Sequence, residues 1–562
     1  METPLMATRS RSRNFRAGVP VLLLGAALLP LLHLAGCVPS APPGSKVEQL
    51  LRARMREDPP DTDPAQSADT LSDRLTLEVH DGLLDFDPET LELIPAVAAA
   101  WAFTSDGLEY TFQIRPGVRF HNGRTLTSED VLYSFTRILD PRVNSKRREI
   151  FAEVKGAEEF SAGRSPRVEG FEAVDPLTLR ITLARPLPYF PQLLATPAAA
   201  IVPKEIYDDP GKGYLVQPVG CGPFRVNRWV RSSFLELSAF DGYYRGRPKL
   251  DRVLIRFIEN PASAMEEYKA GGLEWMDELP GSETQIARDL PLDYRKGPYL
   301  ATYFYGMNLA RKPFQGNVEL RKAFNYAVDR KAICDQIFEG NHTVSHGILP
   351  PGTQGFNPDL RGYGYDPEKA RQHLAKAGYP GGRGLPPIDL WVNNNQKLVQ
   401  AAQKVQADLK AVGIPVRIQA VDFANFLQAV LGTGETPGEA LLYKFGWQAD
   451  YPDPAAFLYW LLHSRNAGPA GNMSRYSNKK VDELLDRAQN LVRMEDRIPL
   501  YREAERIAVE DDAAWLFVAN MTERFLVKPY VKGVVLSRLG MSRIPFDRMW
   551  IEKPPASGPE KR

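Results

Sequence analysis

The stretch LEYTFQIRPGVRFHNGRTLTSEDVLYSFTRILDP, residues 108–141, carries the pattern of a strand followed by the pattern of a helix. In its first part apolar and polar side chains alternate, which is the two-residue period of a half-buried strand. The apolar positions are Leu108, Tyr110, Phe112 and Ile114. The segment TSED (127–130) then resembles a capping box, and an apolar stripe of helical spacing follows it as far as Asp140-Pro141. We therefore expect a strand that leads into a capped helix.

The same two patterns recur along the chain. LTLRITL (177–183) alternates like a strand, and a helical stripe from Leu398 to Val412 precedes another alternating segment at 414–420. A further amphipathic helix is predicted from Val481 to Val492. These patterns indicate a mixed α/β protein without internal repeats.

Length and composition narrow the class of protein. A chain of 562 residues is long enough for two or three domains, and 43% hydrophobic with 25% charged residues is typical of globular proteins. Lys and Arg number 70 against 69 Asp and Glu, so no excess charge favours binding to nucleic acid. We expect no nucleic-acid partner.

The N-terminus has the features of a secretory signal. Four arginines between Arg9 and Arg16 precede an apolar run that ends in LAGC (34–37). A transmembrane helix is the alternative, but the run is short and contains Pro20 and Pro30. LAGC resembles the lipobox of bacterial lipoproteins, which implies a signal peptide at 1–36, a lipid on Cys37 and a tether at 37–46.

Motifs of catalysis are missing from the sequence. It contains no GxSxG, HExxH or P-loop, and the glycine-rich GTGETPG (432–438) has the composition of an ordinary loop. We expect no cofactor, no metal and no enzymatic activity. A metal site at His342 and His346 stays open as an alternative, as does a disulfide between Cys221 and Cys334.

Several long stretches together resemble one known family. They are residues 81–141, PVGCGPFRVNRW (218–229), residues 303–333 and RYSNKKVDELLDRAQ (475–489). In this order they resemble the family 5 extracellular solute-binding proteins, the dipeptide- and oligopeptide-binding receptors of ABC importers. The resemblance covers nearly the whole chain after the signal segment.

The resemblance implies a two-lobed clamshell of the type II periplasmic-binding-protein class. Lobe 1 would comprise 47–92, 198–306 and 518–553, with an inserted subdomain at 93–197. Lobe 2 would span 307–517, and 554–562 would be a tail. Two crossing segments, near Tyr303–Asn308 and Phe517–Glu523, would form the hinge.

The implied function is that of a monomeric, lipid-anchored receptor in the cell envelope, on the periplasmic or extracytoplasmic side. It would capture di- and oligopeptides and deliver them to an ABC permease that works with ATPase subunits. Three alternatives stay open. The same fold would carry a nickel chelate, haem, an oligosaccharide or an opine-like metabolite; the chain would be a secreted lipoprotein enzyme; or it would be an envelope sensor or chaperone without a transporter.

The segment FGWQADYPDPAAFLYWL (445–461) resembles the part of the family that supplies an aspartate for the α-amino group of a peptide. The resemblance implies that Asp450 binds this ammonium, with Trp447 and Tyr451 beside it. Spacing alone favours a turn or cap role for Asp450, and only the resemblance favours the binding role; Trp447 is equally consistent with a core position and with a ligand contact. Asp453, followed by Pro454, has the pattern of a helix start. Candidates for the ligand's carboxylate are Arg311, Arg361, Arg417 and Lys444.

Overall fold

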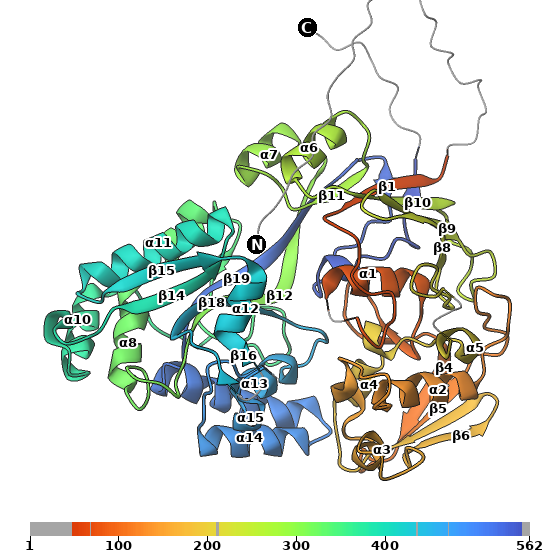
Figure 1. Cartoon of the computed structure of the whole chain (residues 1–562), viewed down its shortest axis with the longest axis horizontal. Helices are drawn as coiled ribbons and strands as arrows, with labels where there is room; N and C mark the ends of the chain where they lie inside the picture. Colours follow the sequence, from red (N-terminus) through yellow and green to blue (C-terminus); the bar gives the residue numbers. More distant parts are fainter. Residues whose placement is uncertain (1–47, 68, 210–212, 434–435, 470, 553–562) are drawn as a thin grey trace, which may run out of the picture. The chain divides into compact units, whose positions relative to one another are not determined.

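The strand and the helix predicted within residues 108–141 are both present in the computed structural model (Figure 1). They are β5 (Glu109–Ile114) and α2 (Ser128–Leu139). The backbone N–H of Thr127 donates to the Asp130 carboxylate at 2.9 Å, as a capping box requires. The alternation and the capping box within this segment were therefore sufficient to predict both elements.

The structure describes residues 48–67, 69–209, 213–433, 436–469 and 471–552. The predicted signal peptide, the tether with Cys37 and the tail at 554–562 lie outside these residues. In the part of the chain that is described, no helix is long and apolar enough to cross a membrane.

A small antiparallel sheet contains β5. Its strand order is β4-β5-β7-β6, with β4 (Ala98–Phe103), β7 (Thr178–Thr182) and β6 (Phe171–Asp175). Helix α2 packs on β6 and β7, where Phe112 and Phe135 are fully buried. The alternating face of β5 and the apolar stripe of α2 thus contribute to the same hydrophobic core.

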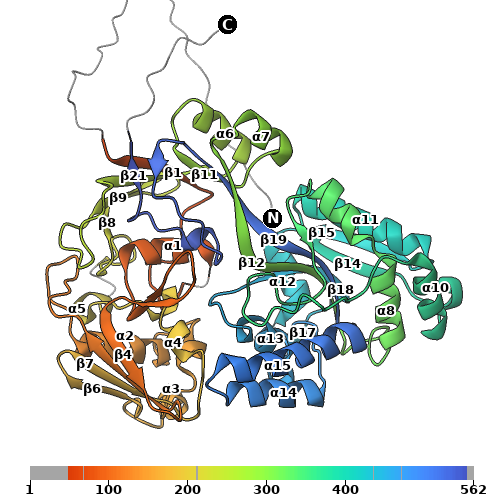
Figure 2. The same ribbon diagram turned by 180° about the vertical axis from the view of Figure 1, so that it is seen from behind.

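The described strands also form a large mixed sheet of eleven members (Figures 1 and 2). Its order begins β15 (Val416–Val421), β14 (Ile388–Asn393), β18 (Leu442–Gln448), β12 (Tyr294–Met307) and β19 (Trp515–Val527). It continues β11 (Trp275–Asp277), β1 (Leu50–Met55), β10 (Arg252–Phe257), β9 (Phe234–Ala239) and β8 (Phe224–Val230). The two-residue β13 (Thr343–Val344) pairs with β19.

β12 and β19 are its longest strands and pair with each other antiparallel. Their register shifts between Pro298 and Thr302 and again between Tyr303 and Phe304. Both sequence-predicted crossing segments overlap these two strands.

Helices cover the sheet in groups that follow the sequence (Figure 1). Near β14 and β15 lie α8 (Val318–Ala327), α10 (Pro367–Lys376), α11 (Gln396–Ala411) and α12 (Phe423–Leu431). A second group consists of α13 (Ala455–Leu462), α14 (Lys479–Gln489) and α15 (Met494–Arg506). Other helices are α1 (Thr70–Val79), α6 (Pro261–Lys269), α7 (Glu283–Asp289) and the short α3 (Ala157–Ser161), α4 (Phe190–Leu193), α5 (Lys204–Tyr207) and α9 (Arg330–Ala332). Small strand pairs are β2 (Leu84–Phe86) with β3 (Leu93–Pro95), β16 (Gly432–Thr433) with β17 (Thr436–Pro437), and β20 (Val531–Lys532) with β21 (Trp550–Ile551).

Two sequence-based element predictions need correction. Helix α14 ends at Gln489 instead of Val492, because Asn490 closes it with backbone bonds to the last turn. The glycine-rich segment 432–438 contains the β16–β17 pair and is not wholly a loop. The strand at 177–183 and the helix-to-strand unit at 398–420 are confirmed as β7, α11 and β15.

The cysteines and histidines considered for a disulfide or a metal site all lie within the described residues. Cys221 and Cys334 are both free and buried, and they belong to different hydrophobic clusters. His342 accepts a hydrogen bond from the backbone N–H of Thr522, and Nδ1 of His346 lies 3.0 Å from the Arg361 carbonyl oxygen. No group of three or more His, Cys, Asp and Glu side chains in the described part of the chain is arranged to hold a metal ion.

Glu505 of α15 gives the fold a predictable pH dependence. Its side chain is 1% exposed and accepts from the N–H groups of Ile348 at 2.7 Å and Leu349 at 2.9 Å. Burial raises the Glu505 pKa from 4.5 to about 7, although the two N–H groups oppose the shift. Since the folded state holds this proton longer than the unfolded chain, stability falls as the pH rises from 4.5 to about 7.

We expect Glu505→Gln to exceed the wild type in free energy of unfolding by less than about 1 kcal/mol at pH 5 and by about 3 kcal/mol at pH 8. Glutamine keeps an acceptor for both N–H groups and has no charge to bury. Urea unfolding at the two pH values measures the difference. An equal gap at both would assign the effect to packing.

Candidate functional site

A cleft of about 530 Å³ lies among the described residues. Its walls come from 146–153, 185–198, 447–460 and 539–543, with Gln489 at the end of α14. Five aromatic rings line it, those of Tyr189, Trp447, Tyr451, Tyr459 and Trp460. This size and lining are typical of a small-molecule or short-peptide site.

Asp450 enters the cleft between two anchored positions of the backbone. Strand β18 pairs with β12 as far as Gln448, and the N–H of Ala449 then donates to the Leu300 carbonyl at 2.9 Å. Three residues further on, Asp453 forms two bonds of 2.8 Å to the Arg497 guanidinium, with both side chains buried. Asp450 is therefore the residue at which the chain leaves the sheet before it is anchored again.

The Asp450 carboxylate is exposed and makes no hydrogen bond or ion pair with any residue that the structure describes. Its charge nevertheless contributes to the pKa shifts of two neighbouring arginines. Burial disfavours the Arg147 guanidinium, but Asp73 and Asp450 outweigh this and raise its pKa. Burial lowers the pKa of Arg543, and Asp85, Asp73 and Asp450 oppose that shift. Asp450 thus stands near fixed charges while its own oxygens remain available.

Trp447 and Tyr451 also line the cleft, and each has a second, structural role. The Trp447 indole N–H donates to the Ala456 carbonyl at 2.7 Å, which ties β18 to α13. Tyr451 is buried, stacks on Tyr189 with ring centroids 5.2 Å apart, and accepts a 3.1 Å bond from Trp460. The sequence-predicted trio therefore shares one wall, and of the three Asp450 alone lacks a protein partner among the described residues.

Asp453 has the structural role predicted for it, with one correction. Helix α13 begins at Ala455, so Pro454 is the capping residue and not the first helical one. The Asp453 carboxylate accepts from the Ala455 N–H at 2.9 Å, as a residue at a helix start does. Its ion pair with Arg497 has no local signal in the sequence.

None of the four cations proposed from sequence for the ligand's carboxylate is among the described lining residues of the cleft. Arg417 pairs with Asp389 on the neighbouring strand, and Arg311 donates to the Glu439 carbonyl. The cations that do line the cleft are Lys146, Arg147, Arg185, Arg465 and Arg543. Lys146 and Arg147 are adjacent, but the other three come from segments far apart in sequence, so no spacing rule could have found the set.

Most of these five cations are already paired with a carboxylate. The pairs are Lys146 with Asp61, Arg147 with Asp73, Arg185 with Glu153 and Arg543 with Asp85. Arg465 makes no ion pair within the described chain; it donates to the Tyr459 hydroxyl at 3.3 Å. Among the described lining residues, the carboxylates of Asp450 and Glu149 and the guanidinium of Arg465 therefore make no ion pair.

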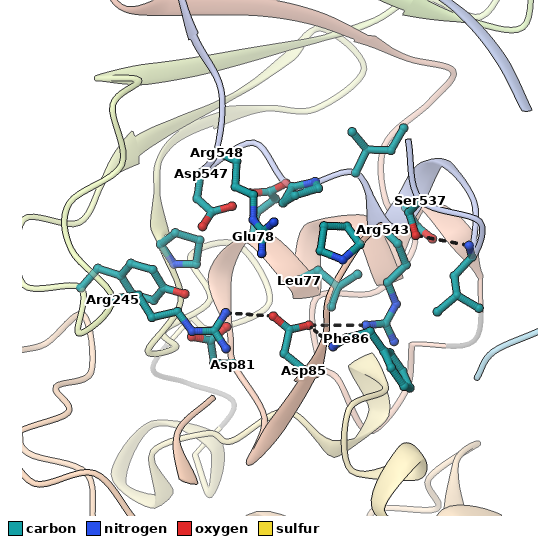
Figure 3. Close-up of a pocket in the computed structure, with 17 residues that line it drawn as sticks. Leu77, Glu78, Asp81, Asp85, Phe86, Arg245, Ser537, Arg543, Asp547 and Arg548 are labelled. Carbon is teal, nitrogen blue, oxygen red and sulfur yellow. Dashed lines mark hydrogen bonds and ion pairs between the residues drawn. The ribbon is translucent and has the colours of Figure 1, made fainter. Parts of the chain in front are cut away.

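A second, much smaller cavity of about 70 Å³ lies between α1 and the segment 537–548 (Figure 3). Arg245 donates to Asp85 at 2.9 Å, and Asp85 lies 4.0 Å from Arg543 on its other side. Burial raises the pKa of Glu78 to about 8 in the same cavity. Arg543 lines both cavities. Its contacts with Asp85 and with the Ala195 carbonyl oxygen hold its guanidinium in the wall of the larger cavity.

The sequence matches one protein-family model and several characterised relatives. The model for bacterial extracellular solute-binding proteins, family 5 (middle), matches residues 92–469. Heme-binding protein A of Haemophilus influenzae is 32% identical over 484 residues, which cover 82% of this chain and 85% of that protein. Glutathione-binding protein GsiB of Escherichia coli is 29% identical over 461 residues, with 81% and 85% covered.

Solved structures share the fold. The binding protein DppA of Helicobacter pylori, in complex with the peptide STSA, superposes with a TM-score of 0.77. It is 27% identical, and the alignment covers 90% of this chain and 98% of that one. The E. coli murein tripeptide binding protein MppA superposes equally well, with a TM-score of 0.77, at 24% identity over 91% of this chain and 99% of that one. The two-lobed binding-protein fold expected from sequence is thereby confirmed.

Proposed function

Because this chain belongs to family 5 of the bacterial extracellular solute-binding proteins, we propose that it captures short peptides in the cleft around Asp450 and delivers them to an ABC permease. The observation that carries the proposal is the unpaired Asp450 carboxylate in a cleft that also presents the unpaired Arg465 guanidinium. A peptide zwitterion has one ammonium and one carboxylate, and thus complements this pair of charges.

The lining supports a ligand whose side chains vary. The aromatic rings provide apolar area without requiring one ligand shape, and bridging waters can satisfy ligand groups that reach no protein atom. Two relatives point the same way, because one is named for glutathione, itself a tripeptide, and one solved structure contains a tetrapeptide.

Haem is the second cargo to consider, since one relative is named for it. Histidine, methionine and cysteine are common ligands of haem iron. None of the three occurs among the described residues that line the cleft, where tyrosine is the only side chain that commonly serves as an axial ligand. The charged pair of Asp450 and Arg465 favours a peptide.

Native mass spectrometry tests the proposed cargo directly. The purified protein is incubated with an equimolar mixture of synthetic peptides of two to five residues with varied side chains, and separately with hemin. We expect peptide adducts of one-to-one stoichiometry and no specific hemin adduct. A hemin complex together with no bound peptide would refute the peptide proposal.

We also propose the lobe and hinge assignment made from sequence: lobe 1 from 47–92, 198–306 and 518–553, the insertion 93–197, and lobe 2 from 307–517. Its support is that β12 and β19 carry both crossing segments and that β12 changes register at Tyr303. Such irregularities are where strands bend. Ligand would favour the closed form by its higher affinity for that form, and the permease would recognise it.

The lipid on Cys37 and the location in the cell envelope are further parts of the proposal, and Cys37 lies outside the described residues. The family description calls these proteins extracellular, and the segment 9–37 has the order of features that a lipoprotein signal requires. In a bacterial host, Cys37→Ser is expected to move the protein from the membrane fraction to the soluble fraction. Immunoblots of the two fractions measure this, and a variant that stays membrane-bound would remove the anchor from Cys37.

A further inference from the structure

Gln489, the last residue of α14, has a buried side-chain amide without a partner. Its side chain is 0% exposed, and neither its nitrogen nor its oxygen forms a hydrogen bond with any described residue. It nevertheless belongs to the lining of the cleft. A buried polar group without partners is costly, and native proteins retain few of them. A buried amide in the lining of a binding cleft has a natural partner in a bound ligand.

Two other residues on the Gln489 face of α14 hold a neighbouring segment of the chain in place. Asp482, Asp486 and Gln489 follow one another on a single face, at helical spacing. Asp482 accepts from the Ser464 hydroxyl at 2.6 Å, and Asp486 lies 3.1 Å from the His463 imidazole. These contacts hold the 463–464 segment on the same face of α14 whose next turn carries Gln489.

Arg465 follows directly on that anchored segment. It lines the cleft, donates to the Tyr459 hydroxyl and has no carboxylate partner in the described chain. Its neighbourhood differs from that of Asp450. Asp450 acts on the charges of Arg147 and Arg543, whereas Arg185 interacts with Glu153 and Tyr459. Four of the cations that line the cleft thus fall into two sets. Arg147 and Arg543 interact with Asp450, whereas Arg185 and Arg465 interact with Tyr459.

We propose that Gln489 and Arg465 form the subsite for the carboxyl end of the bound peptide, an inference that rests on the proposed function. Arg465 binds the terminal carboxylate through charge-assisted bonds. The Gln489 amide pairs with the last peptide unit of the ligand: its N–H group donates to the carbonyl, and its oxygen accepts from the peptide N–H. Both contacts involve groups that every peptide has, so the subsite reads the end of the ligand and not its sequence.

The variant Gln489→Met separates this role from a structural one, because the two predict opposite signs for stability. Methionine has a similar length and no polar atoms. We expect the unliganded variant to melt about 1–2 °C higher, because a buried unpaired amide is gone. Its affinity for the tightest peptide from the native mass spectrometry mixture should fall about tenfold. Differential scanning calorimetry and titration calorimetry measure the two effects.

Gln192→Met is the matched control. The Gln192 side-chain oxygen is also buried without a partner among the described residues, but Gln192 does not line this cleft. We expect Gln192→Met to bind the peptide with the affinity of the wild type. A Gln489→Met variant that melts lower and binds the peptide as the wild type does would overturn the role of Gln489.

Arg465 is tested with a second form of the same peptide, amidated at its carboxyl end. The wild type should bind the free acid at least tenfold more tightly than the amide, and Arg465→Gln should bind both alike. If the variant keeps the wild-type preference, Arg465 does not bind the carboxylate. If the wild type binds no peptide at all, the proposed function fails and this inference fails with it. Peptide binding that depends on Asp450 but on neither Gln489 nor Arg465 overturns only this subsite.

Discussion

The variant Arg497→Met is expected to lose about 3–5 kcal/mol of unfolding free energy, because it leaves a charge buried without its partner. Asp453 and Arg497 are 0% and 2% exposed in their side chains, and two bonds of 2.8 Å join them. The Arg497 guanidinium also donates to the Tyr501 hydroxyl at 2.7 Å. Without it, the Asp453 carboxylate keeps only the Ala455 N–H as a partner among the described residues.

Urea unfolding at neutral pH measures this loss. The control is the double variant Asp453→Leu with Arg497→Met, which removes both charges. We expect it to be more stable than Arg497→Met alone, because no buried charge is left without a partner. If Arg497→Met and the double variant lose the same free energy, the cost lies in packing around Arg497 and not in the orphaned carboxylate.

The second large effect is on binding. Asp450→Asn is expected to weaken the affinity for a peptide with a free amino terminus about 100-fold, because the ligand's ammonium then enters the cleft without its counter-charge. The asparagine has nearly the same shape, so packing is kept. The stability of the unliganded protein should change little, since the Asp450 carboxylate is exposed and bonds to no described residue.

Titration calorimetry with two forms of one peptide, free and N-acetylated, provides the measurement. The acetylated form has no ammonium, so the wild type and Asp450→Asn should bind it with similar, weak affinity. Glu149→Gln is the matched control, because Glu149 is a second carboxylate in the lining. Equal losses for the free and the acetylated peptide would remove Asp450 from the amino-group role.

Sequence reasoning succeeded where the decisive interactions are local. The β5–α2 unit follows from alternation and from a capping box whose two members are three residues apart. The structural role of Asp453 before α13 was likewise predictable, because its carboxylate bonds to the nearby Ala455 N–H. The prediction for α14 ran past Gln489, since Leu491 and Val492 continue the apolar spacing although Asn490 has already closed the helix.

The rest of the cleft depends on contacts between distant segments. Arg497 lies 44 residues from Asp453, and no pattern at either position indicates the pair. Gln489 in the sequence resembles any polar residue at a helix end, and only its burial without partners distinguishes it. Asp450 was found through resemblance to a family motif, because spacing alone does not separate a turn aspartate from a binding one.

The pairing of β18 with β12 has a mechanical consequence. The last backbone bond before Asp450 runs from Ala449 to Leu300, which lies inside the irregular part of β12 between Pro298 and Thr302. The backbone that presents the carboxylate is therefore coupled to the strand that would flex as the lobes rotate. If the proposed hinge includes this part of β12, a bound ammonium that displaces Asp450 would also displace Leu300, and ligand occupancy and the angle between the proposed lobes would depend on each other.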